Sequence, residues 1–118
     1  MGTAESTFLT TEPFGRGVIA HITQPKITER EAAILQQEIG EAAAGANYRV
    51  AVDIGEVEFL ASAGIGTLIN VHKLCKANRG KLVLFGVTEQ LLQVLKLARL
   101  DRVFTIKPDA ASAGKAVS

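Results

Sequence analysis

The sequence predicts an α/β fold built on a largely parallel sheet. Apolar runs of strand length alternate with apolar-patterned runs of helix length, in the order strand, strand, helix, strand, helix, strand, helix, strand. Strands that are separated by single helices form right-handed crossovers and pair in parallel. The length of 118 residues suits one domain with its own core and is too short for two.

The first two predicted strands, residues 8–12 and 17–22, lie close together in the sequence. A turn near Pro13 and Gly15 separates them, which favours an antiparallel pair. Pro13 has no amide N–H to donate to a ladder, so the pair belongs at an edge of the sheet. Residues 1–7 are polar and are predicted to form a flexible N-terminus.

The next element is a helix, which opens with the capping-box pattern of Thr28 and Glu31. Apolar residues then recur at helical spacing until Gly45, near which the helix should end. Residues 50–54 form the following strand, because their apolar side chains alternate from one side to the other.

The second half of the chain repeats this alternation. A helix that opens near Ser62 carries apolar residues over more than one narrow stripe, so much of it should be buried. Residues 82–87 are continuously apolar, as in a central strand, and a helix at 89–98 follows them. Residues 103–106 give the last strand, and residues 108–118, rich in Ala, Ser and Gly, are predicted to be a flexible tail.

Composition and charge exclude several classes of protein. Hydrophobic residues make up 47% and charged residues 21%, as in an ordinary globular domain. A net charge of +1 provides no electrostatic attraction to nucleic acid or to an anionic membrane. No apolar stretch is long enough to insert across a bilayer, and the N-terminus lacks the pattern of a secretory signal. The single Cys fits a reducing compartment, so we expect a cytoplasmic protein.

The sequence lacks a complete enzyme or metal motif. Residues 60–64 lack the first Gly of Gly-x-Ser-x-Gly, and no acidic partner can be placed beside His21 or His72 from the sequence. His72 and Cys75 lie about one helical turn apart, but two ligands do not make a metal site. Asp53 ends a strand without an acidic pair for Mg²⁺, so it is expected to hydrogen-bond the following loop. We therefore predict no catalytic residue, no metal and no cofactor.

The junction between strand 50–54 and the next helix is the most informative stretch. Ser62 stands there among small residues. As an N-cap it would accept a hydrogen bond from a first-turn amide, which contributes roughly 1 kcal/mol. Alternatively, the free amides and the positive end of the helix dipole would favour a phosphate at this serine. Gly64 and Gly66 lower helix propensity but permit close approach of the sheet or of a docking partner.

These residues resemble the signature of STAS domains, in particular the single-domain bacterial anti-sigma factor antagonists (anti-anti-sigma factors). The shared features are the strand that ends in Asp53, the apolar pair at 59–60, and a serine followed by a small residue and Gly at 62–66. The resemblance extends from about residue 8 to residue 106. It implies a STAS domain over residues 8–107, with a mixed, mostly parallel sheet of about five strands and helices mainly on one face. Ala61 departs from the family, which usually has Asp at this position, and the departure bears on kinase recognition rather than on the fold.

The resemblance also implies a function, that of a partner-switching regulator of transcription. The phosphoacceptor would be Ser62, and the implied partner-binding residues are Ala61, Ser62, Ala63, Gly64, Ile65, Gly66 and Thr67. The implied partners are an anti-sigma factor that is a serine kinase of the histidine-kinase-like ATPase fold, and a metal-dependent Ser/Thr phosphatase. The alternative is a non-switching STAS scaffold or accessory subunit of a signalling assembly or transport complex, in which Ser62 is only a cap.

Overall fold

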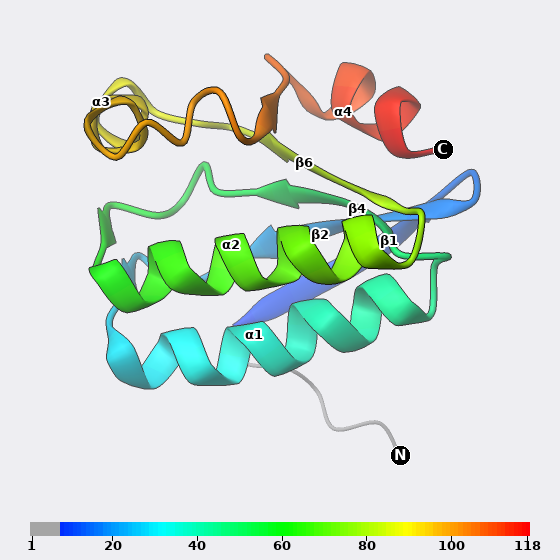
Figure 1. Ribbon diagram of the computed structural model, residues 1–118, viewed down its shortest axis with the longest axis horizontal. Helices are drawn as coiled ribbons and strands as arrows, with labels where there is room; N and C mark the ends of the chain where they lie inside the picture. Colours follow the sequence, from blue (N-terminus) through cyan, green and yellow to red (C-terminus); the bar gives the residue numbers. More distant parts are fainter. Residues whose placement is uncertain (1–7) are drawn as a thin grey trace.

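A five-stranded mixed sheet runs through the middle of the molecule (Figure 1). The computed structural model describes residues 8–118, so the predicted flexible N-terminus at 1–7 lies outside the described residues. The strand order is β1-β2-β4-β6-β7, with β1 antiparallel to β2 and all other pairs parallel, as predicted. The strands are β1 (Leu9–Phe14), β2 (Gly17–Ile22), β4 (Arg49–Asp53), β6 (Lys81–Phe85) and β7 (Thr105–Ile106). The last strand is shorter than the predicted span 103–106.

Neighbouring residues of the three central strands, β2, β4 and β6, face two separate apolar clusters, one on each side of the sheet. In β4, Val50 and Val52 belong to the larger cluster, while Ala51 belongs to the smaller one. The parallel register places Ala51 between Ile19 of β2 and Val83 of β6, so the smaller cluster crosses three strands. A strand that is buried on both faces explains the near-continuous apolar runs in the sequence.

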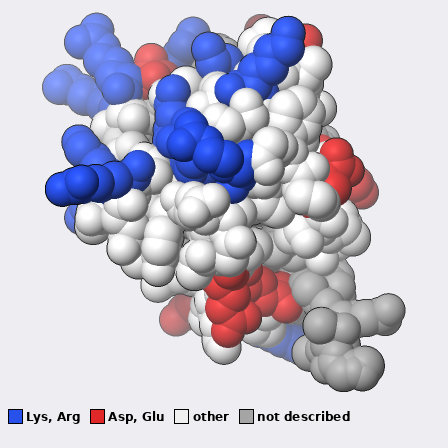
Figure 2. Space-filling model, turned by 90° about the vertical axis from the view of Figure 1, so that its right-hand side faces the viewer, with Lys and Arg blue, Asp and Glu red and all other residues white. Residues whose placement is uncertain are grey.

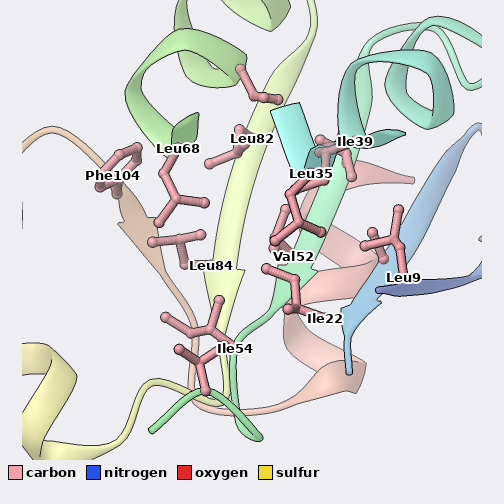
Figure 3. Close-up of a cluster of buried hydrophobic side chains, with 14 of the residues drawn as sticks. Leu9, Ile22, Leu35, Ile39, Val52, Ile54, Leu68, Leu82, Leu84 and Phe104 are labelled. Atoms are coloured by element: carbon pink, nitrogen blue, oxygen red, sulfur yellow. The ribbon is translucent and has the colours of Figure 1, made fainter. Parts of the chain in front are cut away.

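The larger cluster is covered by three helices, α1 (Glu29–Ala44), α2 (Ser62–Ala77) and α3 (Glu89–Leu97). Helices α1 and α2 lie side by side on this face (Figure 1). In Figure 3, Leu35 of α1 and Leu68 of α2 lie close to sheet residues such as Val52 and Leu84. None of the helices within residues 8–118 has the length and apolar character needed to cross a membrane.

Side chains cap the starts of two helices, and the first of these caps is the predicted capping box. The Thr28 amide donates to the Glu31 carboxylate at 2.9 Å and closes the capping box at the start of α1. The Thr88 hydroxyl accepts from the Leu91 amide at 3.3 Å at the start of α3. Hydrogen bonding to Thr28 also lowers the pKa of Glu31, which keeps its carboxylate ionised.

The C-terminal residues form a further helix, α4 (Ala110–Val117), which corrects the flexible tail predicted at 108–118. Ala113 and Val117 are completely buried in the smaller cluster, on the face of the sheet opposite α1 and α2 (Figure 1). The Asp109 carboxylate caps the helix by accepting from the Ser112 amide at 2.8 Å. Small side chains let this helix lie close to the sheet, and the same small side chains gave the segment the composition of a tail.

A second, two-stranded sheet fixes the start of α2. Strands β3 (Lys26–Ile27) and β5 (Phe59–Leu60) pair in parallel, and neither was predicted from the sequence. The amides of Glu58 and Phe59 donate to the Pro25 carbonyl at 2.7 and 3.0 Å, and the Ala61 amide donates to the Ile27 carbonyl at 2.9 Å. Backbone hydrogen bonds therefore hold the segment that precedes α2 against the segment that precedes α1.

Candidate functional site

Ser62 is exposed and is the first residue of α2. Ala61, not Ser62, holds the N-cap position, with φ −71° and ψ 166°, so the interpretation of Ser62 as a capping residue is wrong. The Ala61 methyl group cannot accept a hydrogen bond, so the N-cap residue provides no side-chain cap for this helix end. The start of α2 therefore presents both a serine hydroxyl and the positive end of a helix dipole to the surface.

The two glycines of the first turns have different surroundings. A Cβ on Gly64 would lie 2.5 Å from Leu60 Cδ1 and 2.9 Å from Ile27 Cγ2, so this glycine permits close packing of α2 on the small sheet. A Cβ on Gly66 would meet no atom within 4 Å. Gly64 is thus required for the packing of α2 on the small sheet, whereas Gly66 faces open space on the outer surface of the helix.

Two of the predicted partner-binding residues are buried. Thr67 is 4% exposed, and its hydroxyl donates to the Ala32 carbonyl of α1 at 2.8 Å. This hydrogen bond joins α2 to α1, so little of the Thr67 side chain is left at the surface for the predicted contact with a partner. Gly64 is buried as well. The predicted residues that stay at least partly exposed are Ala61, Ser62, Ala63, Ile65 and Gly66.

Asp53 connects the end of β4 to the loop that leads to Ser62. Its Oδ1 accepts from the Gly55 amide at 2.8 Å, which confirms the predicted bond to the loop. Its Oδ2 lies 2.7 Å from His21 Nδ1, and His21 Nε2 lies 3.5 Å from Glu12 Oε2. Both ring nitrogens of this histidine thus face carboxylates, so the cluster joins strands β1, β2 and β4.

This cluster was not predicted, because no acidic residue lies beside His21 in the sequence. The parallel register of β2 and β4 pairs His21 with Asp53, although 32 positions separate them in the sequence. The available signal was that each of the two strands carries one polar residue near its carboxyl end. Parallel neighbours bring such residues to the same edge of a sheet.

His72 and Cys75 are packing residues on α2. Cys75 is completely buried, and burial raises the pKa of its thiol to about 11. The His72 ring packs edge-on against Phe104, with 5.6 Å between ring centroids, and its Nδ1 has no hydrogen-bond partner among residues 8–118. Burial and the nearby Lys76 charge lower the pKa of His72. No group of three His, Cys, Asp or Glu residues in the described part is arranged to hold a metal ion.

Comparison with known proteins relates this arrangement to one family. The family model described as "Mlab, STAS domain" matches residues 25–107. The anti-sigma-B factor antagonist of Listeria monocytogenes is 28% identical over 94 residues, which cover 80% of this chain and 75% of that protein. A STAS domain protein of Planctomyces limnophilus has a TM-score of 0.81 at 20% identity, with 93% of this chain and 97% of that chain covered. The phosphorylated form of Bacillus SpoIIAA has a TM-score of 0.69 at 14% identity, with 92% and 98% covered.

Proposed function

Because the chain belongs to the STAS domain family, we propose that it is an anti-sigma factor antagonist and that it binds its partner through the start of α2. The Listeria relative, itself an anti-sigma-B factor antagonist, supports the general role over most of both chains. The observation that carries the proposal is the position of Ser62, exposed at the first residue of a helix whose N-cap residue, Ala61, has no capping side chain.

The surface around Ser62 suits close contact with another protein. Ala61 and Ala63 have short side chains, and Gly66 has none. A partner can therefore approach the helix backbone closely and exclude water from the contact. In the proposed complex, the anti-sigma factor is captured by this surface and the sigma factor is released.

Phosphorylation of Ser62 would switch the contact off. The partner, acting as a serine kinase of the histidine-kinase-like ATPase fold, would transfer the γ-phosphoryl group of ATP to Ser62 Oγ, with loss of the hydroxyl proton and release of ADP. The phosphate brings a charge of about −1.5 to −2 and a strongly bound hydration shell. The helix dipole favours this anion, so the domain stays folded. A dry, close-fitting contact becomes costly, and a loss of ~3 kcal/mol weakens affinity more than a hundredfold.

The reverse step would be hydrolysis by a metal-dependent Ser/Thr phosphatase. Water takes up the phosphoryl group, inorganic phosphate leaves, and the serine hydroxyl is restored. Because Ser62 is exposed, either enzyme can reach its hydroxyl without unfolding of the domain. Ala61 supplies no carboxylate next to the acceptor, so kinase recognition must depend on other groups near α2.

Intact mass after incubation with the kinase and ATP tests the acceptor. We expect the wild type to gain about 80 Da, the mass of one phosphoryl group, and Ser62→Ala to gain nothing. Ser112→Ala is the matched control, because the Ser112 hydroxyl is bonded to Asp109 at the start of α4. An equal gain in Ser62→Ala would reject Ser62 as the acceptor. If Ser62→Asp binds the partner as tightly as the wild type does, the chain is a non-switching scaffold or accessory subunit.

A further inference from the structure

Phe59 is an exposed aromatic residue immediately before the start of α2. Its exposed fraction is 53%, whereas the other four Phe residues and Tyr48, all within the described part, are buried or half-buried. Burying a Phe side chain stabilises a protein by about 1.5–3 kcal/mol, and this residue forgoes much of that contribution. Aromatic residues are enriched at the buried centres of protein interfaces.

The backbone holds Phe59 in a fixed position. Its amide donates to the Pro25 carbonyl at 3.0 Å, and its register partner in β3 is Lys26. The next residue, Leu60, packs into the larger core cluster, so the alternation of a strand directs Phe59 outward. A side chain presented on a rigid strand loses little backbone freedom when a partner covers it.

The surroundings of Phe59 carry negative charge. Glu56 and Glu58 precede it and are exposed, and the sequence between Arg49 and Lys73 contains no Lys or Arg. The cation nearest in register is Lys26, which lies across from Phe59 in β3. This end of α2 therefore offers an aromatic ring flanked by acidic side chains.

The other end of α2 has the opposite character. Lys73, Lys76 and Arg79 are exposed in its last turns and just beyond it. Figure 2 views the molecule from the side where α1 and α2 end, and Lys and Arg side chains gather over the upper part of that side. A charge difference of this kind orients an approaching partner, so that a basic surface meets the end with Ser62 and Phe59.

We propose that Phe59 anchors the complex by inserting into an apolar pocket of the anti-sigma factor, and that Lys or Arg residues around that pocket pair with Glu56 and Glu58. This inference rests on the proposed function and adds residues that precede α2 to the binding surface. The Phe59 ring supplies affinity, because it is desolvated in the pocket. The two carboxylates supply orientation and association rate, because they stay near solvent at the rim.

Calorimetric titration tests the anchor, with the histidine-kinase-like anti-sigma factor that binds the unmodified protein as the titrant. We expect Phe59→Ala to weaken affinity about tenfold or more, since truncation of a central interface residue has this effect. Leu74→Ala is the matched control, because Leu74 is an exposed apolar residue, 39% accessible, near the other end of α2. This variant should bind the anti-sigma factor with the affinity of the wild type. Thermal unfolding of both variants checks that they fold like the wild type.

Ser62→Asp, titrated alongside, separates this inference from the proposed function. If Phe59→Ala binds as tightly as Leu74→Ala while Ser62→Asp weakens binding, the anchor is rejected and the proposed binding site stands. If neither Phe59→Ala nor Ser62→Asp changes the affinity, both are rejected. Glu56→Gln combined with Glu58→Gln should slow association and reduce its dependence on salt. An unchanged salt dependence would reject the basic rim of the pocket.

Discussion

At the scale of single residues, His72 makes the stability of the domain depend on pH. Burial and the Lys76 charge lower its pKa from the ordinary value of 6.5, so the folded state binds this proton less readily than the unfolded chain does. The stabilising effect of the neutral ring is complete at pH values above 6.5, where the ring is neutral in both the folded and the unfolded chain. It is lost as the pH falls through the lowered pKa of the folded state.

We expect His72→Gln to show a weaker dependence of unfolding free energy on pH. Urea unfolding of both proteins at pH values on each side of 6.5 measures the difference. The wild type should lose stability relative to the variant as the solution becomes acidic, because only the wild type has a ring that resists protonation. Parallel pH curves for the two proteins would contradict this explanation.

Cys75 should be unreactive in the folded protein. With its pKa raised to about 11 from an ordinary value of 9.0, it carries about a hundredfold less thiolate at neutral pH than an exposed cysteine. Burial also blocks reagents from the sulfur atom. Labelling with a thiol reagent should be slow in buffer and fast in concentrated urea. Rapid labelling of the native protein would show that α2 does not pack as described.

At the scale of elements, the first turns of α2 combine a structural glycine with a surface glycine. Gly64→Ala should lower stability by about 1–3 kcal/mol, because its Cβ would press on Leu60 and Ile27. Gly66→Ala should raise stability by roughly 0.5–1 kcal/mol, because alanine favours the helix and space is available. Urea unfolding measures both changes, and shifts of the same sign would contradict these assignments.

The variant Gly66→Ala also tests the close contact that is proposed between this helix and the partner. If the partner approaches the helix backbone at Gly66, an added methyl group obstructs it, so Gly66→Ala should bind more weakly although it is more stable. Calorimetric titration of this variant with the anti-sigma factor gives the answer. An affinity equal to that of the wild type would mean that the partner does not come close to Gly66.

At the scale of the whole molecule, α4 covers the second face of the sheet and makes the domain three layers thick. Arg49 of β4 holds this helix, because its Nε donates to the Val117 carbonyl at 2.7 Å. Val117→Ala should lower the free energy of unfolding by about 1.5 kcal/mol, the contribution of two buried methyl groups. Ala111→Ser, an exposed position of the same helix, should change the unfolding free energy little. Equal stability of the two variants would favour the flexible tail over the helix.

Much of the fold could be predicted because its large elements carry strong local patterns. The apolar runs of β4 and β6 and the caps at Thr28 and Thr88 mark their elements without reference to the rest of the chain. The small sheet of β3 and β5 has two residues in each strand, which is too few to show a periodicity. Helix α4 depends on the sheet face beneath it, which its own composition does not reveal.

The start of a helix near Ser62 could be predicted for the same reason, whereas the contacts around it could not. The junction at Ser62 has a recognisable series of residues, but which of two neighbours takes the N-cap conformation depends on how β5 is held by β3. The burial of Thr67 could not be predicted from local sequence, because the carbonyl that its hydroxyl contacts, that of Ala32, lies on another helix. His21 and Asp53 meet only through the register of two strands.

A phosphate at the exposed start of α2 is expected to end partner binding. Calorimetric titration of the anti-sigma factor with unmodified protein and with protein phosphorylated at Ser62 measures this effect. We expect the unmodified protein to bind more than about a hundredfold tighter, which corresponds to ~3 kcal/mol. Equal affinities of the two forms would contradict the claim.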